Sequence, residues 1–280
     1  MSDDAVSANS KSAVSPETWR KIAFVWASLA AKPISKPDEV IEEFWQRVSD
    51  VLDFDTAFLV LAHHSELDRR AERLGYIEGW VPAEVFYAPD SYDPAHAAAI
   101  EEFRRERMPH DTWIQHNIAA AGEHRTFIRQ DVLGDEPWES CSTGWLMEQM
   151  DVRDRMISVF ALDDSVEVHL GFDRRGPTSF APIDRNTVHA LNKGLGPFWA
   201  RLAMSFGLYK HQQSLTPRQR ETLLYLLDGY SEAEIAELMN LTQGSAHQYV
   251  VAVFRSLNVN SRAELMAKWM GDYGIEVPEP

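Results

Sequence analysis

The chain has little of what disulfide-stabilised, membrane-spanning and phosphate-binding proteins require. Its 280 residues include a single cysteine, Cys141, so no internal disulfide framework can form, as is usual in a reducing compartment. No apolar run approaches the ~20 residues of a membrane span, and no charged-then-apolar leader is present. Glycine-rich phosphate loops, nucleophile elbows and paired zinc-ligand motifs are also missing from the sequence. We therefore expect a cytoplasmic protein without enzymatic activity, cofactor, metal or membrane contact.

Positive charge is scarce as well. Lys and Arg number 27 against 43 Asp and Glu, a net charge of −16, and 45% of the residues are apolar. A chain of this length has room for about two domains with real cores. Residues 1–210 carry 22 basic and 34 acidic side chains, which argues against contact with nucleic acid or anionic membrane in that region.

The residues from Leu215 onward contain a regular series of helix starts and stops. Thr216 is a good N-cap, Pro217 suits a first helical position, and Gly229 ends the helix. Ser231 caps a second helix, and Thr242 caps a third after a short turn. The expected apolar faces are Leu223, Leu226 and Leu227; Ile235, Leu238 and Met239; Ala246, Val250, Val253 and Leu257; and, in a fourth helix over 262–270, Leu265, Met266 and Trp269.

From Leu215 to about Met270 this pattern resembles, without a gap, the helix-turn-helix domain of LuxR-type (GerE-like) transcription regulators. The strongest matches are the Leu-Thr-Pro opening at Leu215, the Glu-Ile-Ala beginning at Glu234, and the ending Leu257–Arg262. The resemblance implies a homodimer that binds an inverted repeat in double-stranded DNA, with the third helix in the major groove. The implied contacts are His247, Gln248 and Val251 to base edges and Thr242, Ser245 and Arg255 to phosphates, with Arg218 or Arg220 assisting.

The departures from this family lower the expected affinity for DNA. The family's recognition helix usually begins Thr-Val-Lys followed by His, but this chain has Ser245, Ala246 and His247 there, and Gln219 replaces a usual Glu. Residues 211–280 hold five Lys or Arg against nine acids, a net of −4, and cations supply most non-specific DNA affinity. We expect weak binding by a monomer. One alternative is an interaction or self-assembling module whose helix-turn-helix no longer binds DNA strongly. Another is the end of a sigma-type initiation factor, against which the Leu257–Arg262 ending argues.

The first region has the element order of a sensor domain. Helices are expected over 16–31, 38–52, 95–107 and 111–121, a buried strand over 54–62, a hairpin over 155–162 and 166–173, and one long helix over 182–209 interrupted at Gly194, Gly196 and Pro197. Residues 168–175 and 179–185 resemble the closing portion of GAF-like domains joined to LuxR-type ends. The resemblance to GAF or PAS domains implies a sheet with helices against it, a small-molecule cavity, and a last helix that transmits changes to the DNA-binding end.

The predicted fold is therefore α+β, with a GAF/PAS-like α/β sensor domain followed by an all-α four-helix LuxR-type domain. The expected divisions are a disordered 1–15, a sensor and dimerisation domain over 16–210, the helix-turn-helix over 211–270 and an acidic tail over 271–280. Candidate ligand-pocket residues are the aromatic side chains Trp80, Tyr87, Phe103, Trp113 and Trp145, for which ordinary core packing is the alternative. The spacing of His110, Asp111, His116 and His124 matches no tight metal site, and Cys141 lacks basic neighbours that would activate its thiol.

Overall fold

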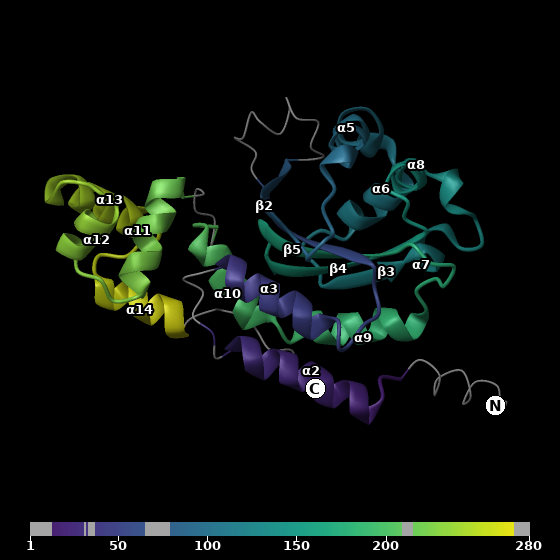
Figure 1. Cartoon of the computed structure of the whole chain (residues 1–280), viewed down its shortest axis with the longest axis horizontal. Helices are drawn as coiled ribbons and strands as arrows, with labels where there is room; N and C mark the ends of the chain where they lie inside the picture. The colour runs from purple at the N-terminus through teal and green to yellow at the C-terminus, as the bar shows by residue number, and fades with distance from the viewer. Residues whose placement is uncertain (1–12, 31, 33–36, 65–78, 209–214, 272–280) are drawn as a thin grey trace. The chain divides into compact units, whose positions relative to one another are not determined.

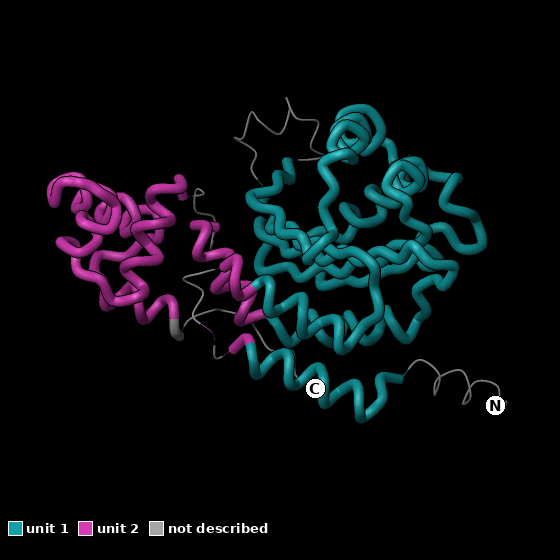
Figure 2. Tube along the Cα trace, viewed as in Figure 1, with its two compact units in different colours: residues 1–28, 41–195 teal, residues 29–40, 196–280 magenta. Residues whose placement is uncertain are grey.

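The chain divides into two compact units. The computed structural model describes residues 13–30, 32, 37–64, 79–208 and 215–271. Residues 1–28 with 41–195 form one unit, here called the sheet unit, and 29–40 with 196–280 form the other, here called the helical unit (Figures 1 and 2). The predicted disordered start, up to residue 12, and the acidic tail after residue 271 lie outside the described residues. No helix in the described ranges is long and apolar enough to cross a bilayer.

The sheet unit is built on five antiparallel strands in the order β2-β1-β5-β4-β3. The strands are β1 (Thr56–His64), β2 (Trp80–Tyr87), β3 (Arg125–Ile128), β4 (Asp154–Asp163) and β5 (Val166–Arg174). The predicted hairpin is confirmed as β4 and β5, and the predicted buried strand as β1. Strands β2 and β3, the two edges, lie in a stretch for which the sequence indicated no strand.

One face of the sheet is covered by α3 (Pro37–Val48) and α9 (Pro182–Lys193), and α2 (Pro16–Ala30) lies on the far side of these helices from the sheet (Figure 1). Alternate residues of the strands point to this face and are fully buried, among them Leu59 and Phe172. The Trp45 ring of α3 meets Phe172 edge to face, with centroids 6.1 Å apart. Helix α2 is attached to α9, because the Trp26 indole donates to the Leu191 carbonyl at 2.8 Å.

The other face is covered by short helices (Figure 1). They comprise η1 (Pro94–His96), α5 (Ala97–Glu102), the π-helical turn η2 (Phe103–Arg107), η3 (Met108–His110), α6 (Thr112–Ala119), α7 (Arg129–Leu133), η4 (Trp138–Ser140) and α8 (Ser142–Gln149). The helices predicted over 95–107 and 111–121 are thus confirmed, the first with a π turn. Asp111 caps α6 and also accepts from the Thr143 amide and hydroxyl at 2.7 and 2.8 Å, so one buried carboxylate joins α6 to α8.

The helical segment predicted over 182–209 is divided into two helices at the glycines that were expected to interrupt it. Helix α9 ends at Lys193, and α10 (Gly196–Ser205) begins after Gly194 and Leu195. The Trp26 ring explains the glycine, because a Cβ on Gly194 would lie 2.2 Å from two of its ring carbons. Pro197 lacks the N–H that a continuing helix needs. The break also separates the units, since α9 belongs to the sheet unit and α10 to the helical unit.

The helical unit continues with α11 (Pro217–Leu227), α12 (Glu232–Leu238), α13 (Gln243–Ser256) and α14 (Arg262–Gly271), as the caps predicted. The expected stripe of α13 is buried throughout. The prediction that Leu238 belongs to the buried face of α12 is wrong, because Leu238 is 50% exposed and Ala236 is buried instead. The turns use positive φ, with Gly229 at +98° and Asn240 at +55°, which glycine and asparagine tolerate best.

Candidate nucleic-acid interface and ligand cavity

A cavity of about 490 Å³ lies in the sheet unit, between the sheet and helices α5, α6 and α8. Phe58, Val60 and Ala62 of β1 form part of its floor, because alternate residues of a strand share one face. The remaining lining is mainly apolar and comes from the other strands and the covering helices. The volume lies within the ~300–1,000 Å³ of small-molecule sites.

Four of the five aromatic residues proposed from the sequence line this cavity: Trp80, Tyr87, Phe103 and Trp113. Trp145 is not among its lining residues. Its ring instead lies under the Arg107 guanidinium, 4.0 Å from centroid to Cζ. Trp113 also packs into a small core, with the Phe127 and Trp138 ring centroids each 4.7 Å away.

Arg155 and Asp173 form a buried ion pair beside the cavity floor. Arg155 Nε and Nη2 donate to the two Asp173 carboxylate oxygens at 2.6 and 2.8 Å. The guanidinium lies 5.4 Å from the centroid of the Phe58 ring. That ring in turn lies against Gly171, where a Cβ would come within 2.1 Å of it. The glycine therefore lets an aromatic ring lie flat on the sheet between polar groups.

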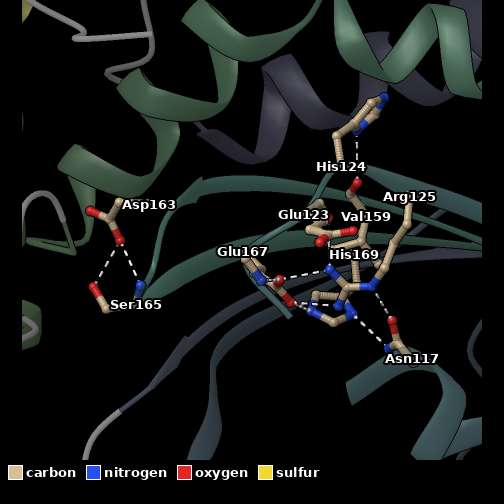
Figure 3. A network of polar contacts seen from close by, with 10 residues as sticks. Asn117, Glu123, His124, Arg125, Val159, Asp163, Ser165, Glu167 and His169 are labelled. Carbon is tan, nitrogen blue, oxygen red and sulfur yellow. Dashed lines mark hydrogen bonds and ion pairs between the residues drawn. The ribbon is translucent and has the colours of Figure 1, made fainter. Parts of the chain in front are cut away.

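A second polar cluster, Asn117–Arg125–Glu167–His169, lies further along the same face (Figure 3). Arg125 binds both oxygens of Glu167 at 2.7 and 2.9 Å, and its Nε donates to Asn117 Oδ1. His169 Nε2 lies 3.0 Å from Glu167 Oε2, and His169 Nδ1 lies 3.4 Å from Asn117 Nδ2. The His169 ring therefore lies between the Glu167 carboxylate and the Asn117 amide.

Glu167 is ionised despite being only 1% exposed. Burial by itself would raise its pKa, but His169 and Arg125 outweigh that effect and lower the pKa to about 2. The amide of Gly122 also donates to Glu167 Oε1 at 2.8 Å. The cluster thus joins β5, β3, α6 and the turn before β3.

On the opposite face of β3, His124 contacts α9. Its two ring nitrogens lie 2.8 and 3.1 Å from the carbonyl oxygens of Val159 and His189, and the centroids of the His124 and His189 rings lie 4.2 Å apart, with the rings tilted by 34°. Burial lowers the pKa of both histidines, to about 4 for His189, and the neighbouring His124 lowers that of His189 further. In Figure 3 His124 points away from the Arg125 cluster.

The described residues contain no group of three or more His, Cys, Asp or Glu arranged to hold a metal ion. His116 instead contacts the Phe127 ring, and Asp111 acts as the cap described above. Burial raises the pKa of the Cys141 thiol, whose Sγ lies 3.5 Å from the Trp138 carbonyl oxygen. These contacts give His116, Asp111 and Cys141 structural roles.

In the helical unit, three successive helices carry side-chain caps. Thr216 with Gln219 and Ser231 with Glu234 form reciprocal capping boxes, and Thr242 accepts from the Ser245 amide at 3.2 Å. Such caps fix where α11, α12 and α13 begin. The turn between α12 and α13 is therefore short and defined, as a helix-turn-helix requires.

Helix α13 exposes His247, Gln248 and Arg255, with Val251 partly covered. His247 is 56% exposed, and its Nδ1 lies 3.0 Å from Glu232 Oε2 in the first turn of α12. An acid is therefore placed beside the residue that replaces the family's usual lysine. Thr242 and Ser245, at the exposed start of α13, also share a hydroxyl contact at 3.0 Å.

Most cations of the helical unit after residue 211 are already engaged within it. Arg218 pairs with Glu221 at 2.9 Å, and Arg220 lies 3.6 Å over the Phe206 ring. Arg262 donates to the carbonyls of Tyr230 and Leu226, and Lys268 to that of Leu257. Among these five, only the Arg255 side chain makes no hydrogen bond, ion pair or ring contact with the described part of the chain.

Residues 213–268 match the family described as bacterial regulatory proteins, luxR family (GerE). The C-terminal domain is a LuxR-type helix-turn-helix domain. A curated relative, the probable HTH-type transcriptional regulator GfsR of Streptomyces halstedii, is 33% identical over 63 residues. That alignment covers 22% of this chain and 26% of the relative, so the chain matches only about a quarter of the relative's length. The matched family consists of regulators, in agreement with the expectation of a non-enzymatic protein.

Two solved structures resemble the chain over most of its length. SdiA in complex with octanoyl-rac-glycerol is 14% identical and covers 93% of this chain and 98% of its own, with a TM-score of 0.43. Escherichia coli SdiA in another crystal form is 12% identical over 91% and 98%, with a TM-score of 0.35. Both scores are low, so the likeness does not establish a shared fold.

Sequence reasoning found the LuxR-type helices but missed the polar groups of the cavity. Arg125 and Glu167 are 42 residues apart, and Arg155 and Asp173 are 18 apart. No local motif pairs them, because their contacts depend on the strand register. The only available signal was that charged residues interrupt strands that are otherwise apolar.

Proposed function

We propose that the chain is a LuxR-type transcription regulator that binds an inverted repeat as a homodimer. The observation that carries the proposal is the capped α12–turn–α13 arrangement, which presents His247, Gln248 and Arg255 on one exposed helix. A helix of this kind enters the DNA major groove. Gln248 can pair with an adenine edge, and Val251 can contact a thymine methyl group.

Phosphate contacts come mainly from the start of α13 and from Arg255. Thr242 and Ser245 hold hydroxyl groups at the helix N-terminus, where the helix dipole also favours an anion. Arg218 and Arg220 contribute less, since their guanidinium groups already have partners in the unit. With so few free cations, one copy binds weakly, and a dimer with two recognition helices is required for tight binding.

The sheet unit is proposed to act as a GAF/PAS-like sensor. Its support is a cavity between an antiparallel sheet and covering helices, with Trp80, Tyr87, Phe103 and Trp113 in the lining. Strand β3 offers a route out of the cavity. Its Arg125 faces the cavity, while Thr126 on the other face contacts Ser158 Oγ at 2.7 Å and His189 of α9 at 3.2 Å. Displacement of Arg125 by a ligand would therefore change the contact between Thr126 and His189 of α9. Helix α9 ends two residues before α10 begins.

The test is a mobility shift of the full-length protein on genomic fragments at low and moderate salt. We expect specific retarded complexes that survive competitor DNA, and their loss in the variant combining Gln248→Ala with Arg255→Ala. Glu148→Gln, a change on α8 of the sheet unit, is the matched control and should behave as wild type. Failure of the wild-type protein to select any fragment, with its fold intact, would instead favour an interaction or self-assembling module.

A further inference from the structure

The cavity carries three arginines, and each is matched by a carboxylate. Arg125 pairs with Glu167 and Arg155 with Asp173; Glu167, Arg155 and Asp173 are buried, and the Arg125 side chain is 10% exposed. Arg104, on the covering helices, pairs with Glu101, whose side chain is 55% exposed. The cationic groups along the wall are therefore neutralised by the protein itself, and none awaits an anion from a ligand.

The Arg125–Glu167 and Arg155–Asp173 pairs differ in whether a hydrogen-bond donor remains available to a ligand. The Arg125 pair belongs to the closed cluster with Asn117 and His169, whose polar atoms mostly face one another. Arg155 uses only Nε and Nη2 for Asp173, and its Nη1 makes no hydrogen bond within the described residues. The Arg155 Nη1 group is therefore a charge-assisted donor at the Phe58 end of the cavity, where a neutral ligand oxygen could accept a hydrogen bond from it.

Strand register separates these two ends. Arg155 and Asp173 are paired in the β4–β5 ladder, and Glu167 lies six residues before Asp173 in β5. At ~3.4 Å per residue this is roughly 20 Å along the strand. The floor between them is formed by Phe58, Val60 and Ala62. An occupant that uses the whole floor is apolar along its body and polar at the Arg155 end.

We propose that the cavity selects an uncharged amphipathic ligand whose oxygen-bearing end accepts from Arg155, and that Asp173 and Glu167 are the residues that exclude carboxylates. This inference rests on the proposed sensor function and specifies its ligand class. A carboxylate entering the cavity would lose its hydration without gaining a free cation, and two ionised carboxylates would repel it. An alcohol, ester or amide avoids both costs.

Replacing Asp173 or Glu167 by its amide reverses this balance. Asp173→Asn preserves the shape of the side chain but leaves the Arg155 charge without its partner. A ligand carboxylate can then supply the missing charge, so binding of an anionic amphiphile stabilises the variant. Glu167→Gln tests the same logic at the other end of the cavity and remains informative if Asp173→Asn folds poorly.

The experiment compares n-decanol with n-decanoate, probes of equal chain length, on the full-length protein at concentrations where neither aggregates. Binding is followed by quenching of tryptophan fluorescence, because Trp80 and Trp113 line the cavity, and by the shift in melting temperature. Wild type should bind decanol at least about tenfold more tightly than decanoate. The Asp173→Asn or Glu167→Gln variant should bind decanoate about tenfold or more tightly than wild type does, and its affinity for decanol should change little.

Glu106→Gln removes an acid from the exposed Arg105–Glu106 pair and should retain the wild-type preference. Equal binding of both probes by wild type, or an unchanged preference in both folded amide variants, would overturn the proposal. Absence of binding by either probe would overturn it as well. DNA binding by α13 is measured separately, so these outcomes leave the helix-turn-helix assignment untouched.

Discussion

The two units of this chain use charge in opposite ways. In the sheet unit, Arg155–Asp173 and Arg125–Glu167 are buried ion pairs that connect strands and border a cavity. In the helical unit, Arg218–Glu221 and His247–Glu232 lie at the surface. Breaking a buried pair is costly because the charge that remains is neither paired nor solvated, whereas exposed pairs contribute little to stability. We therefore propose that charge in the sheet unit determines structure and ligand selectivity, and that charge in the helical unit determines affinity for DNA.

The largest expected difference between the units comes from breaking one pair in each. Asp173→Ala leaves Arg155 buried without a partner and should lower the free energy of unfolding by about 3–5 kcal/mol. Glu221→Ala, at an exposed pair on α11, should cost less than about 0.5 kcal/mol. Denaturant unfolding of both variants measures the contrast. Equal losses would show that the buried pair is no more important than the exposed one.

Acid should destabilise the sheet unit first. His189 has a folded pKa of about 4 against an ordinary 6.5, so its stabilising contribution is complete above pH 6.5 and is lost as the pH falls to about 4. Glu167, lowered from 4.5 to about 2, adds a further loss between those values. The combined effect is on the order of a few kcal/mol.

Melting temperatures measured from pH 8 to pH 2 follow both losses, that of His189 down to about pH 4 and that of Glu167 below pH 4.5. His189→Gln should flatten the profile between pH 6.5 and 4. A profile unchanged by His189→Gln would rule out this histidine as the source.

Glycines distinguish the units at a smaller scale. Gly171→Ala would place a Cβ 2.1 Å from the Phe58 ring, so we expect a loss of about 1–3 kcal/mol as the ring is displaced. Gly244→Ala, in α13, meets nothing within 4 Å and should be neutral or stabilise by up to ~1 kcal/mol. Thermal denaturation gives both values. Tolerance of Gly171→Ala would mean that the floor of the cavity can relax around Phe58.

The smallest expected changes concern phosphate contacts. Arg255→Ala should weaken binding by about tenfold or less and reduce the slope of log affinity against log salt by about one. Arg218→Ala should have less effect, because Glu221 already holds that guanidinium. Fluorescence anisotropy on a labelled duplex at several salt concentrations measures both. A larger loss for Arg218→Ala than for Arg255→Ala would contradict the assignment of the free cation.

The sequence predicted the helical unit better than the sheet unit for a physical reason. Helix starts depend on residues three apart, such as Thr216 with Gln219, and these can be read locally. The exposure of Leu238 could not be predicted, because the four-helix packing decides which side of a short helix is buried. In the sheet unit, β1 and the β4–β5 hairpin follow from local apolar runs and a turn. The edge strands and the Glu167 cluster depend on register between distant segments, which no local pattern specifies.

The central claim is that α13 reads DNA sequence, and selection from a randomised duplex library tests it most directly. Full-length wild type and Gln248→Ala are each taken through selection, and the enriched sequences are compared. We predict that wild type enriches an inverted repeat and that Gln248→Ala loses discrimination at one symmetric pair of positions, a cost of about 1–3 kcal/mol for the preferred base. No enrichment by wild type, or identical preferences for the two proteins, would contradict this assignment of α13.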